Sequence, residues 1–553
     1  MSSDNVIENW RDPDTTSRRE RRKVPSRFYD PNWSWNHLVV FLLTFFSYAL
    51  FHSGRKTFSV VKGTMLKAWL PANVSGNSSY AEAHGAFSEN AQTWSSKHHH
   101  MFDSSDDAKK FMGVLDCTFL FAYATGLYIS GMLGDRFDPR LVLSIGMWLT
   151  SFTVFLFGTL SEWLHLYNEV YYTAVWILCG FVQSAGWPTE VCIMGNWFGR
   201  GGRGWLLGIW SACASVGNII GAFIAYEFLP YGYEYTFLIN ASFLFCGGWV
   251  IFFGLVSAPR DIGLPDAIED LHDAPPSEKD EKASSHERPR AISITKAILL
   301  PGVISYCLAY ACLKLVNYSF FFWLPLYLQT NFGWSNDVSD SLSTFYDWGG
   351  IAGGLVGGII TDFMTTRTPV VEGMLVFSIG AMFAYAKSPK DRVVNGALMT
   401  IAGFFVNGAA NLISAAVSAD LGRQPEVAGH SEALATVTGL VDGTGSVGAA
   451  IGQVLLPLLQ EARNWMAVFY MLIFFAFCTI LCLLPLFIKE TRAWLAERSA
   501  VYRRCCVNDG EDEPMLSHQE EEEEAYTNEA DRSIGDGRRI FRTLLPARRE
   551  HVD

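Results

Sequence analysis

Runs of about twenty apolar residues follow one another along the chain, and they constrain its fold more than any other feature. A helix rises about 1.5 Å per residue, so each run is long enough to cross the roughly 30 Å hydrocarbon layer of a bilayer. The sequence therefore predicts an all-α polytopic membrane protein with twelve transmembrane helices. We expect these spans near residues 37–60, 111–132, 141–160, 171–194, 204–228, 236–257, 299–328, 343–363, 370–387, 394–419, 432–458 and 466–488.

Charged residues make up 18% of the chain and gather outside the apolar runs. The segment 258–298 is charged and rich in Pro and Ser, which is typical of a flexible linker. Two matching six-helix halves are typical of transporters that bind their substrate between repeats. We therefore predict a basic leader over 1–36, an N-terminal half over 37–257, the linker over 258–298, a C-terminal half over 299–488 and an acidic disordered tail over 489–553.

Basic residues and glycosylation sequons indicate the orientation. Arg and Lys recur in the leader, in the turns near 136–140, 200–203, 367 and 423, and after the last run, whereas the opposite loops near 162, 231 and 336 hold none. Both termini are therefore predicted to be cytoplasmic. The loop 66–110 then faces the lumen or exterior, and its sequons predict glycosylation at Asn73 and Asn77. The first run follows a long leader, so we expect it to stay as a signal anchor.

The remaining composition excludes several functions. Much of the net charge of −13 lies in the tail, so the charge says little about partners, and we expect no nucleic-acid partner. The eleven cysteines suggest no disulfide framework. The adjacent histidines at 98–100 lack further ligands at suitable spacing, so we expect no metal site. Because the sequence holds no nucleophile–base pair or nucleotide loop, we predict that the protein is not an enzyme and needs no cofactor.

The turn after the second run carries a charged motif. It reads Gly131-Met-Leu-Gly-Asp135-Arg136-Phe-Asp-Pro-Arg140, and a shorter echo in the second half ends at Asp362. The pattern resembles the loop motif G-x-L-x-D-R-x-x-x-R of the major facilitator superfamily and implies its fold. Glycines allow close helix approach. The acid and the bases are expected to form a cytoplasmic charge latch that breaks as the halves rock.

A second stretch is more specific. It combines Gln-Ser-Ala-Gly-Trp-Pro at 183–188, Gly-Asn-Trp-Phe at 195–198 and Ser-Val-Gly-Asn at 215–218. These residues resemble the organophosphate:phosphate antiporters, and the runs at 313–328, 415–424 and 431–453 resemble the sugar phosphate exchangers, solute carrier family 37. The resemblance implies a secondary-active carrier with alternating access. Its substrates would be sugar phosphates, glycerol phosphate or related phosphonate-like anions, moved in exchange for inorganic phosphate.

Arg55 is the first candidate binding residue. An arginine within a span is costly and marks function by default, and its guanidinium can hold phosphate oxygens through two parallel hydrogen bonds. The resemblance implies the same role, since Arg55 matches the family's first-helix arginine; an arginine that reaches the membrane surface is the alternative. Tyr48 and His52 precede it on the same helix and are candidate cavity residues. Lys56 and Lys62 are expected nearer to a membrane face.

The seventh run supplies Lys314, the only strong cation between residues 306 and 328. An unpaired lysine there is costly, so we expect it to face a water-filled cavity. The resemblance places the bacterial family's arginine at Asn317, one turn further along the same helical face. Lys314 is therefore expected to substitute for it. The family's fifth-helix histidine falls on Ala214 and its second-helix lysine on Leu127, which leaves fewer basic groups for phosphate.

Three carboxylates also lie within the runs, at Asp116, Asp347 and Asp442. Each is a candidate coupling group that relays a proton, or a partner for Arg55 or Lys314, and a structural role is equally open. Two other functions therefore remain: a proton-coupled exporter of another polyanion, and a membrane receptor or scaffold that has the fold without transport.

Localisation rests on two signals. Glycosylation requires entry into the endoplasmic reticulum, and the family resemblance implies residence in its membrane. Residues 511–516 (Glu-Asp-Glu-Pro-Met-Leu) resemble an acidic dileucine sorting signal, so the lysosomal membrane is the alternative. The lipid bilayer is the expected partner, and an accessory membrane subunit is left open.

Overall fold

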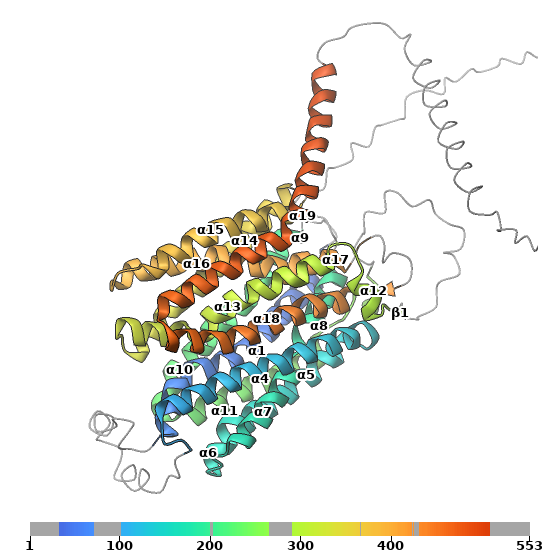
Figure 1. The fold of residues 1–553 in the computed structure, drawn as a ribbon. Coiled ribbons are helices and arrows are strands. Elements are labelled where there is room, and N and C mark those ends of the chain that lie inside the picture. The colour runs from blue at the N-terminus through green and yellow to red at the C-terminus, as the bar shows by residue number, and fades with distance from the viewer. Residues whose placement is uncertain are drawn as a thin grey trace, which may run out of the picture. The chain divides into compact units, whose positions relative to one another are not determined.

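A bundle of long helices makes up the protein in the computed structural model (Figure 1), which describes residues 33–70, 101–198, 203–264, 290–364, 366–422, 424 and 431–508. The chain divides into two compact units, one that extends to Thr491 and one that starts at Arg492. The first unit holds the bundle. The predicted glycosylation sites Asn73 and Asn77, and the sorting signal at 511–516, lie outside the described residues.

The N-terminal half follows the predicted order of spans. Its helices are α1 (Trp35–Ala68), α4 (Ser105–Arg136), α5 (Pro139–Val154), η1 (Phe155–Leu160), α6 (Ser161–Trp163), α7 (Glu169–Gln183), α8 (Gly186–Trp197), α9 (Arg203–Ser211), α10 (Cys213–Phe228), η2 (Leu229–Tyr231), α11 (Tyr233–Gly254) and η3 (Pro259–Ile262). Local sequence explains the sharp turn into α5. Pro139 occupies the first turn, where no N–H is needed, and the Asp138 side chain caps the helix by accepting from the Arg140 N–H at 3.0 Å.

The remaining helices form the C-terminal half. It comprises α12 (Ile294–Ile298), α13 (Val303–Phe332), α14 (Asn336–Met364), α15 (Thr368–Ala386), α16 (Arg392–Asn411), η5 (Leu412–Val417), α17 (Ser418–Leu421), α18 (Leu434–Ala462) and α19 (Trp465–Asn508). The segment η5 is a π-helix inside one continuous span, a feature that often marks functional sites. Helix α19 continues past residue 488, where the predicted span ends.

Ten helices in the described part of the chain are long and apolar enough to cross a membrane. The other two predicted spans are helical as well. The fourth is broken between α7 and α8, at residues 184–185, and the eighth, α14, carries four aspartates along its length. The all-α polytopic fold is therefore confirmed, and the count of twelve spans stays a prediction.

One short element was not predicted. Strand β1 (Arg290–Ala291) pairs in parallel with β2 (Ser431–Glu432), with Arg290 opposite Ser431 and Ala291 opposite Glu432. This pair joins the end of the linker to the segment that leads into α18. Two-residue strands carry no periodic signal in a sequence, so only the tertiary arrangement reveals them.

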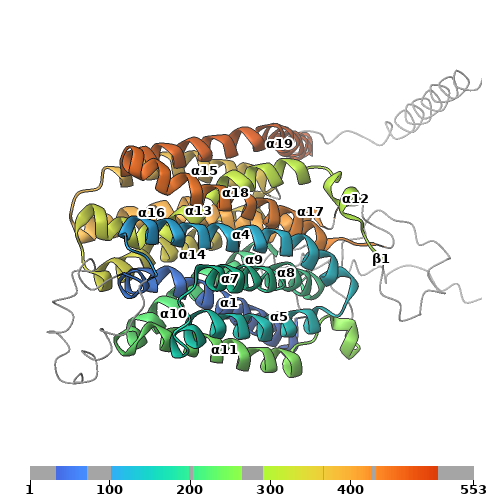
Figure 2. The same cartoon turned by 60° about the horizontal axis from the view of Figure 1, so that its bottom comes forward.

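The two halves meet along several pairs of helices. Helices α4 and α8 pack along α18, α9 and α10 pack along α14, α9 contacts η5, and α1 contacts α13. Figure 2 shows α4, α13 and α18 side by side across the middle of the bundle. We call the end that holds the start of α1, the end of α4 and the start of α18 the α1 N-terminal end. The opposite end is the α1 C-terminal end.

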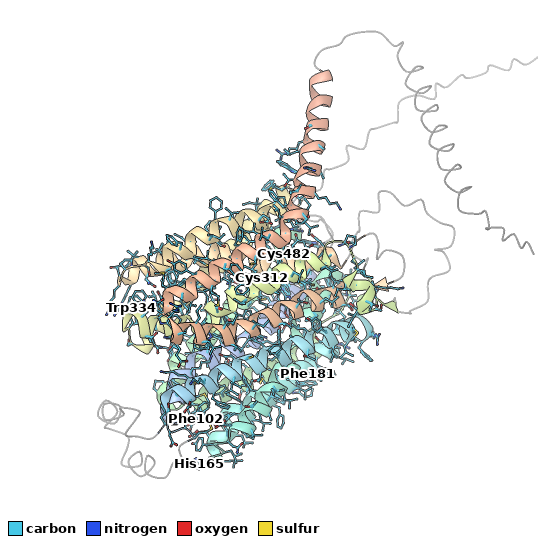
Figure 3. All side chains as sticks on the ribbon, in the orientation of Figure 1. Phe102, His165, Phe181, Cys312, Trp334 and Cys482 are labelled. Atoms are coloured by element: carbon cyan, nitrogen blue, oxygen red, sulfur yellow. The ribbon has the colours of Figure 1, made fainter. Side chains whose placement is uncertain are left out.

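Apolar side chains cover the outside of the bundle, as expected where lipid tails replace water. Phe181, labelled in Figure 3, is 40% exposed on α7. Cys312 of α13 and Cys482 of α19, also labelled there, are free thiols, as are Cys117, Cys179, Cys192, Cys213, Cys246, Cys307 and Cys478. Polar and charged side chains are instead gathered inside, where they build the site.

Candidate functional site

A cavity of about 60 Å³ lies where the two halves meet. Its lining comes from α1, α8 and α10 of the N-terminal half and from α13, α14, α16, η5 and α18 of the C-terminal half. Of the residues that the sequence singles out, the structure brings six to this cavity: Tyr48, His52, Lys314, Asn317, Asp347 and Asp442. Arg55 and Asp116 are not among the lining residues.

Arg55 lies just behind the cavity wall. Its side chain is only 1% exposed, and its guanidinium donates from Nη1 to the Tyr318 hydroxyl at 2.8 Å and from Nε to Gln183 at 3.2 Å. The guanidinium carbon lies 4.4 Å from the centre of the Tyr123 ring. Nη2 is buried without a hydrogen-bond partner among the described atoms. Because Tyr318 lines the cavity, its hydroxyl separates Arg55 from it.

Lys314 faces the cavity but is already paired. Its ammonium donates to Asp442 Oδ1 at 2.8 Å and to the Ser446 hydroxyl at 2.9 Å. The same ammonium lies 5.1 Å from the Tyr318 ring centre and 5.5 Å from that of Tyr123. The ion pair explains how a lysine that is 2% exposed can remain charged. The second oxygen of Asp442 is buried and has no partner among the described atoms.

A chain of hydrogen bonds crosses the cavity from one half to the other. His52 Nδ1 lies 3.0 Å from Asn218 Oδ1, and Asn218 Nδ2 donates to Asp347 Oδ1 at 2.8 Å. With the amide oriented this way, His52 carries its proton on Nδ1. The Asp347 carboxylate therefore orients an amide, and the amide orients the imidazole.

Lys56 also lines the cavity and is 3% exposed, although the sequence placed it nearer to a membrane face. Its ammonium donates to the backbone carbonyl of Phe321 at 3.2 Å, and the Ser59 hydroxyl donates to the same oxygen at 3.3 Å. That carbonyl is available because Pro325, four residues further along α13, has no N–H to bond it. Proline thus creates an acceptor at which α1 binds α13.

Asp116 lies nearer to the α1 C-terminal end. It forms an ion pair with Lys62, whose side chain is 16% exposed. The Lys62 ammonium also lies 5.1 Å from the Phe322 ring centre and 5.6 Å from that of Trp323. This contact ties α1 to α13 across the halves. Asp116 therefore serves the closure of this end rather than the cavity.

At the α1 N-terminal end each half contributes an aspartate that caps a helix of the other half. Asp135 accepts from the backbone N–H of Ala435 at 3.0 Å and of Thr436 at 2.8 Å, at the start of α18. Asp362 accepts from the N–H of Gly204 at 2.9 Å and of Trp205 at 2.8 Å, at the start of α9. A carboxylate is stabilised there by unpaired N–H groups and by the helix dipole.

The motif arginines occupy other positions. Arg136 is exposed, and the Arg140 guanidinium lies 3.7 Å from Asp138 of its own half. Arg367 follows α14 and donates to Asp420 at 2.7 Å, with Asp362 at 3.7 Å. Burial opposes the charge of Arg367, but the Asp420 carboxylate outweighs this effect and raises the pKa of Arg367. The expected charge latch is thus built largely on backbone donors of the opposite half.

Gly131 lets α4 and α18 come close, since a Cβ there would lie 2.7 Å from the Ala435 oxygen.

An aromatic layer closes the cavity toward the same end. The Trp187 ring lies 4.5 Å from that of Tyr48 and stacks on Trp210 at 5.0 Å. The Trp187 indole also donates to the Ser414 carbonyl of η5 at 3.2 Å, which joins the halves. The two halves therefore contact each other on both sides of the cavity.

Sequence reasoning found the neutral residues Tyr48 and Asn317 but missed others. Tyr318, Asn218, Asn407 and Asn411 all line the cavity. Charge within an apolar run is a visible signal, whereas single amides and tyrosines in such a run are common and carry none. Only the rotation of each helix about its axis shows that these side chains face inward.

Comparison with known proteins agrees with this architecture. The family model described as Major Facilitator Superfamily matches residues 44–431. Two solved structures share the fold at 13% identity: a bacterial homologue of the human lysosomal transporter Spinster (TM-score 0.52, covering 84% of this chain and 98% of that one) and the human organic anion transporter MFSD10 (0.54, 81% and 99%). The chain belongs to the Major Facilitator Superfamily.

Its similarity to named exchangers is closer. Sugar phosphate exchanger 3 of Xenopus laevis is 50% identical and that of Homo sapiens 48%, over 86% and 85% of this chain and 97% and 96% of those proteins. Glucose-6-phosphate exchanger SLC37A2 of Mus musculus is 36% identical over 85% of this chain and 96% of that protein. The resemblance to the sugar phosphate exchangers is thereby confirmed. These relatives are named exchangers, in agreement with the prediction that the protein is not an enzyme.

Proposed function

We propose that this protein exchanges phosphorylated organic anions, such as sugar phosphates or glycerol phosphate, for inorganic phosphate by alternating access. The observation that carries the proposal is the convergence of one cation from each half, Arg55 and Lys314, on the same two tyrosines: both lie near the Tyr123 ring, Arg55 bonds the Tyr318 hydroxyl and Lys314 lies near the Tyr318 ring. The names of the relatives, which include sugar phosphate and glucose-6-phosphate exchangers, support it.

Phosphate would bind by exchange of partners. The unpartnered Nη2 of Arg55 offers the first hydrogen bond, and displacement of the Tyr318 hydroxyl from Nη1 offers the second. Together they form the parallel fork that fits a phosphate. Lys314 then supplies a point charge from the other half. Since the cations come from both halves, one ligand draws the halves together.

Liposomes that contain the purified protein and are preloaded with inorganic phosphate provide the test. We expect the wild type to take up glucose 6-phosphate or glycerol 3-phosphate in exchange. Arg55→Lys keeps the charge but loses the fork, and a lost hydrogen bond to a charged group is worth about 1.5–3 kcal/mol, or roughly ten- to a hundredfold in affinity. Lys296→Gln, on an exposed position, is the control. A wild type that exchanges no phosphorylated anion would favour the scaffold function instead.

A second candidate function, proton-coupled transport of a polyanion, is favoured by Asp442. If a ligand takes over Lys314, the Asp442 carboxylate is left buried without its counter-charge, which is costly unless it binds a proton. Uptake should then accelerate in acid, and Asp442→Asn should remove that pH dependence while phosphate exchange continues. Uptake by the wild type that is equally fast at acid and neutral pH would exclude this coupling.

For sidedness, we propose that the α1 N-terminal end faces the cytoplasm and that the protein resides in the endoplasmic reticulum, with the lysosome as the alternative. The basic turns and the sequons support this orientation. Glycosidase treatment should increase gel mobility, and the double substitution Asn73→Gln with Asn77→Gln should abolish the shift. A shift that survives in the double variant would reverse the orientation. Staining against organelle markers separates the two membranes.

A further inference from the structure

Besides its charged groups, the cavity holds a set of neutral polar side chains. We call Asn317 of α13, Tyr346 of α14 and Asn407 and Asn411 of α16 the amide wall. All four line the cavity. Asn407 and Asn411 are one turn apart on α16, so they lie on one face of the helix. Asn411 is the last residue before the π-helix η5.

Hydrogen bonds fix most of the amide wall in place. The Tyr346 hydroxyl donates to Asn317 Oδ1 at 2.7 Å, and Asn317 Nδ2 donates to Asn407 Oδ1 at 3.3 Å. Asn407 Nδ2 in turn donates to the Ser215 hydroxyl of α10 at 3.2 Å. The chain is therefore directional and its amide orientations are set. It also crosses to the N-terminal half, so this chain of hydrogen bonds is complete only when the halves meet.

Asn411 is the exception. Its side chain is 9% exposed, and its Nδ2 is buried without a hydrogen-bond partner among the described atoms. Buried donors are almost always satisfied, and an unsatisfied one on a residue that lines a cavity indicates a partner that the protein itself does not supply. The neighbouring amides are already oriented, so this donor points to a ligand acceptor beside a preformed wall.

The chemistry of the amide wall differs from that of Arg55 and Lys314. Amides carry no charge and offer a donor and an acceptor from one group, which matches a hydroxyl that also donates and accepts. We infer that the amide wall is a polyol subsite, which binds the hydroxyl-bearing carbon skeleton of a sugar phosphate, with Asn411 as its first contact. The inference rests on the proposed function, which assigns the phosphate to the cations.

If the amide wall is a polyol subsite, substituting Asn411 should weaken the binding of glucose 6-phosphate but not that of inorganic phosphate. Inorganic phosphate has no carbon skeleton, so its exchange should not depend on Asn411. In liposomes preloaded with phosphate, we expect Asn411→Ala to raise the concentration of glucose 6-phosphate that halves phosphate uptake by about three- to tenfold, the effect of one neutral hydrogen bond. Phosphate-for-phosphate exchange should stay within about twofold of the wild type, which also shows that the variant is folded.

The control is Thr400→Val, on the same helix but outside the cavity, where the hydroxyl bonds only the Gly396 carbonyl of its own helix. This variant should change neither the inhibition by glucose 6-phosphate nor the rate of phosphate exchange. Unaltered inhibition by glucose 6-phosphate in Asn411→Ala, or an equal loss for both ligands, would overturn the polyol subsite and leave the proposed function intact. A wild type without phosphate exchange would overturn both.

Discussion

At the scale of single residues, the site is governed by partners that a ligand must replace. Arg55 is held by the Tyr318 hydroxyl, and Lys314 by the Asp442 carboxylate. Both cations thus remain charged although they are almost fully buried, because an acceptor within the protein stands where a phosphate oxygen would go. The affinity for a ligand then depends on the bonds that the cations make to the ligand minus the bonds that they lose to Tyr318 and Asp442. Substituting Tyr318 or Asp442 should therefore alter the affinity as much as substituting the cation does.

Tyr318→Phe tests this difference. Removing the hydroxyl frees Nη1 of Arg55, whose guanidinium then keeps its hydrogen bond from Nε to Gln183 and its contact with the Tyr123 ring. We expect the protein to melt earlier without ligand and to be stabilised more by phosphate or glucose 6-phosphate. The affinity should rise by about three- to tenfold, the worth of one hydrogen bond. Ligand-dependent thermal unfolding measures both quantities. Weaker binding by Tyr318→Phe would mean that the hydroxyl contacts the ligand itself.

Only some of the site residues can be predicted from the sequence. Arg55, Lys314 and Asp442 stand out because charge inside an apolar run is rare and costly. Their partners cannot be predicted: Lys314 and Asp442 are 128 positions apart, and no local rule sets the rotation of α13 against α18. Tyr318 and Asn411 carry no such cost outside a tertiary context, so nothing in the sequence marks them. The fold is predictable because the bilayer imposes span length, whereas the site depends on helix register.

At the scale of elements, a proline and a pair of glycines within the helices shape the interface between the halves. Pro325 frees the Phe321 carbonyl at the α1 C-terminal end. At the other end, glycines let α9 approach α14 closely enough for Asp362 to reach backbone donors. A Cβ on Gly358 would lie 2.4 Å from the Gly204 carbonyl oxygen, a distance that real Cβ atoms essentially never show.

Gly358→Ala should therefore hold the α1 N-terminal end open. The added methyl group meets backbone rather than a movable side chain, so α9 and α14 must separate. We expect greater labelling by a thiol reagent of a cysteine introduced at this end. Gly380→Ala on α15 is the matched control, because a Cβ there meets nothing within 4 Å. Equal labelling in both variants would contradict a role for close packing.

Pro325→Ala should loosen the opposite end. An alanine restores an N–H that can bond the Phe321 carbonyl within α13, and this bond competes with Lys56 and Ser59 of α1. We expect the α1 C-terminal end to open more often, although α13 itself becomes a more regular helix. Spin-label distances across that end measure the change. Pro485→Ala on α19 is the control; an effect of equal size there would assign the change to general helix stiffening.

At the scale of the whole molecule, the α1 N-terminal end is held together by two helix caps, one donated by each half to the other. Asp135 of the first half caps α18, and Asp362 of the second half caps α9. The two caps lie at separate interfaces but act on the same opening equilibrium. Their free energies should therefore add, and neither half alone decides whether this end is open.

The double substitution Asp135→Asn with Asp362→Asn measures this additivity. An amide offers one acceptor where the carboxylate uses two, and it loses the interaction with the helix dipole. Each change should cost about 1–1.5 kcal/mol, so single variants shift the opening equilibrium by about tenfold and the double variant by about a hundredfold. Asp138→Asn is the control, since that carboxylate caps α5 within its own half. A double variant that shifts no further than either single one would refute independent latches.

The cations of α1 have a further consequence, which concerns the kinetics of exchange. Arg55, Lys56 and Lys62 bond a hydroxyl, a carbonyl and two aromatic rings of α13, and these contacts close the α1 C-terminal end. Opening without an anion costs Arg55 and Lys56 their hydrogen-bond acceptors on α13, whereas an arriving anion supplies oxygens in their place. The loaded carrier should therefore reorient over a lower barrier than the unloaded one. Substrate on one side of the membrane would then accelerate the departure of substrate from the other, and the preference for counter-transport over one-way flux would follow from the residues that close the gate.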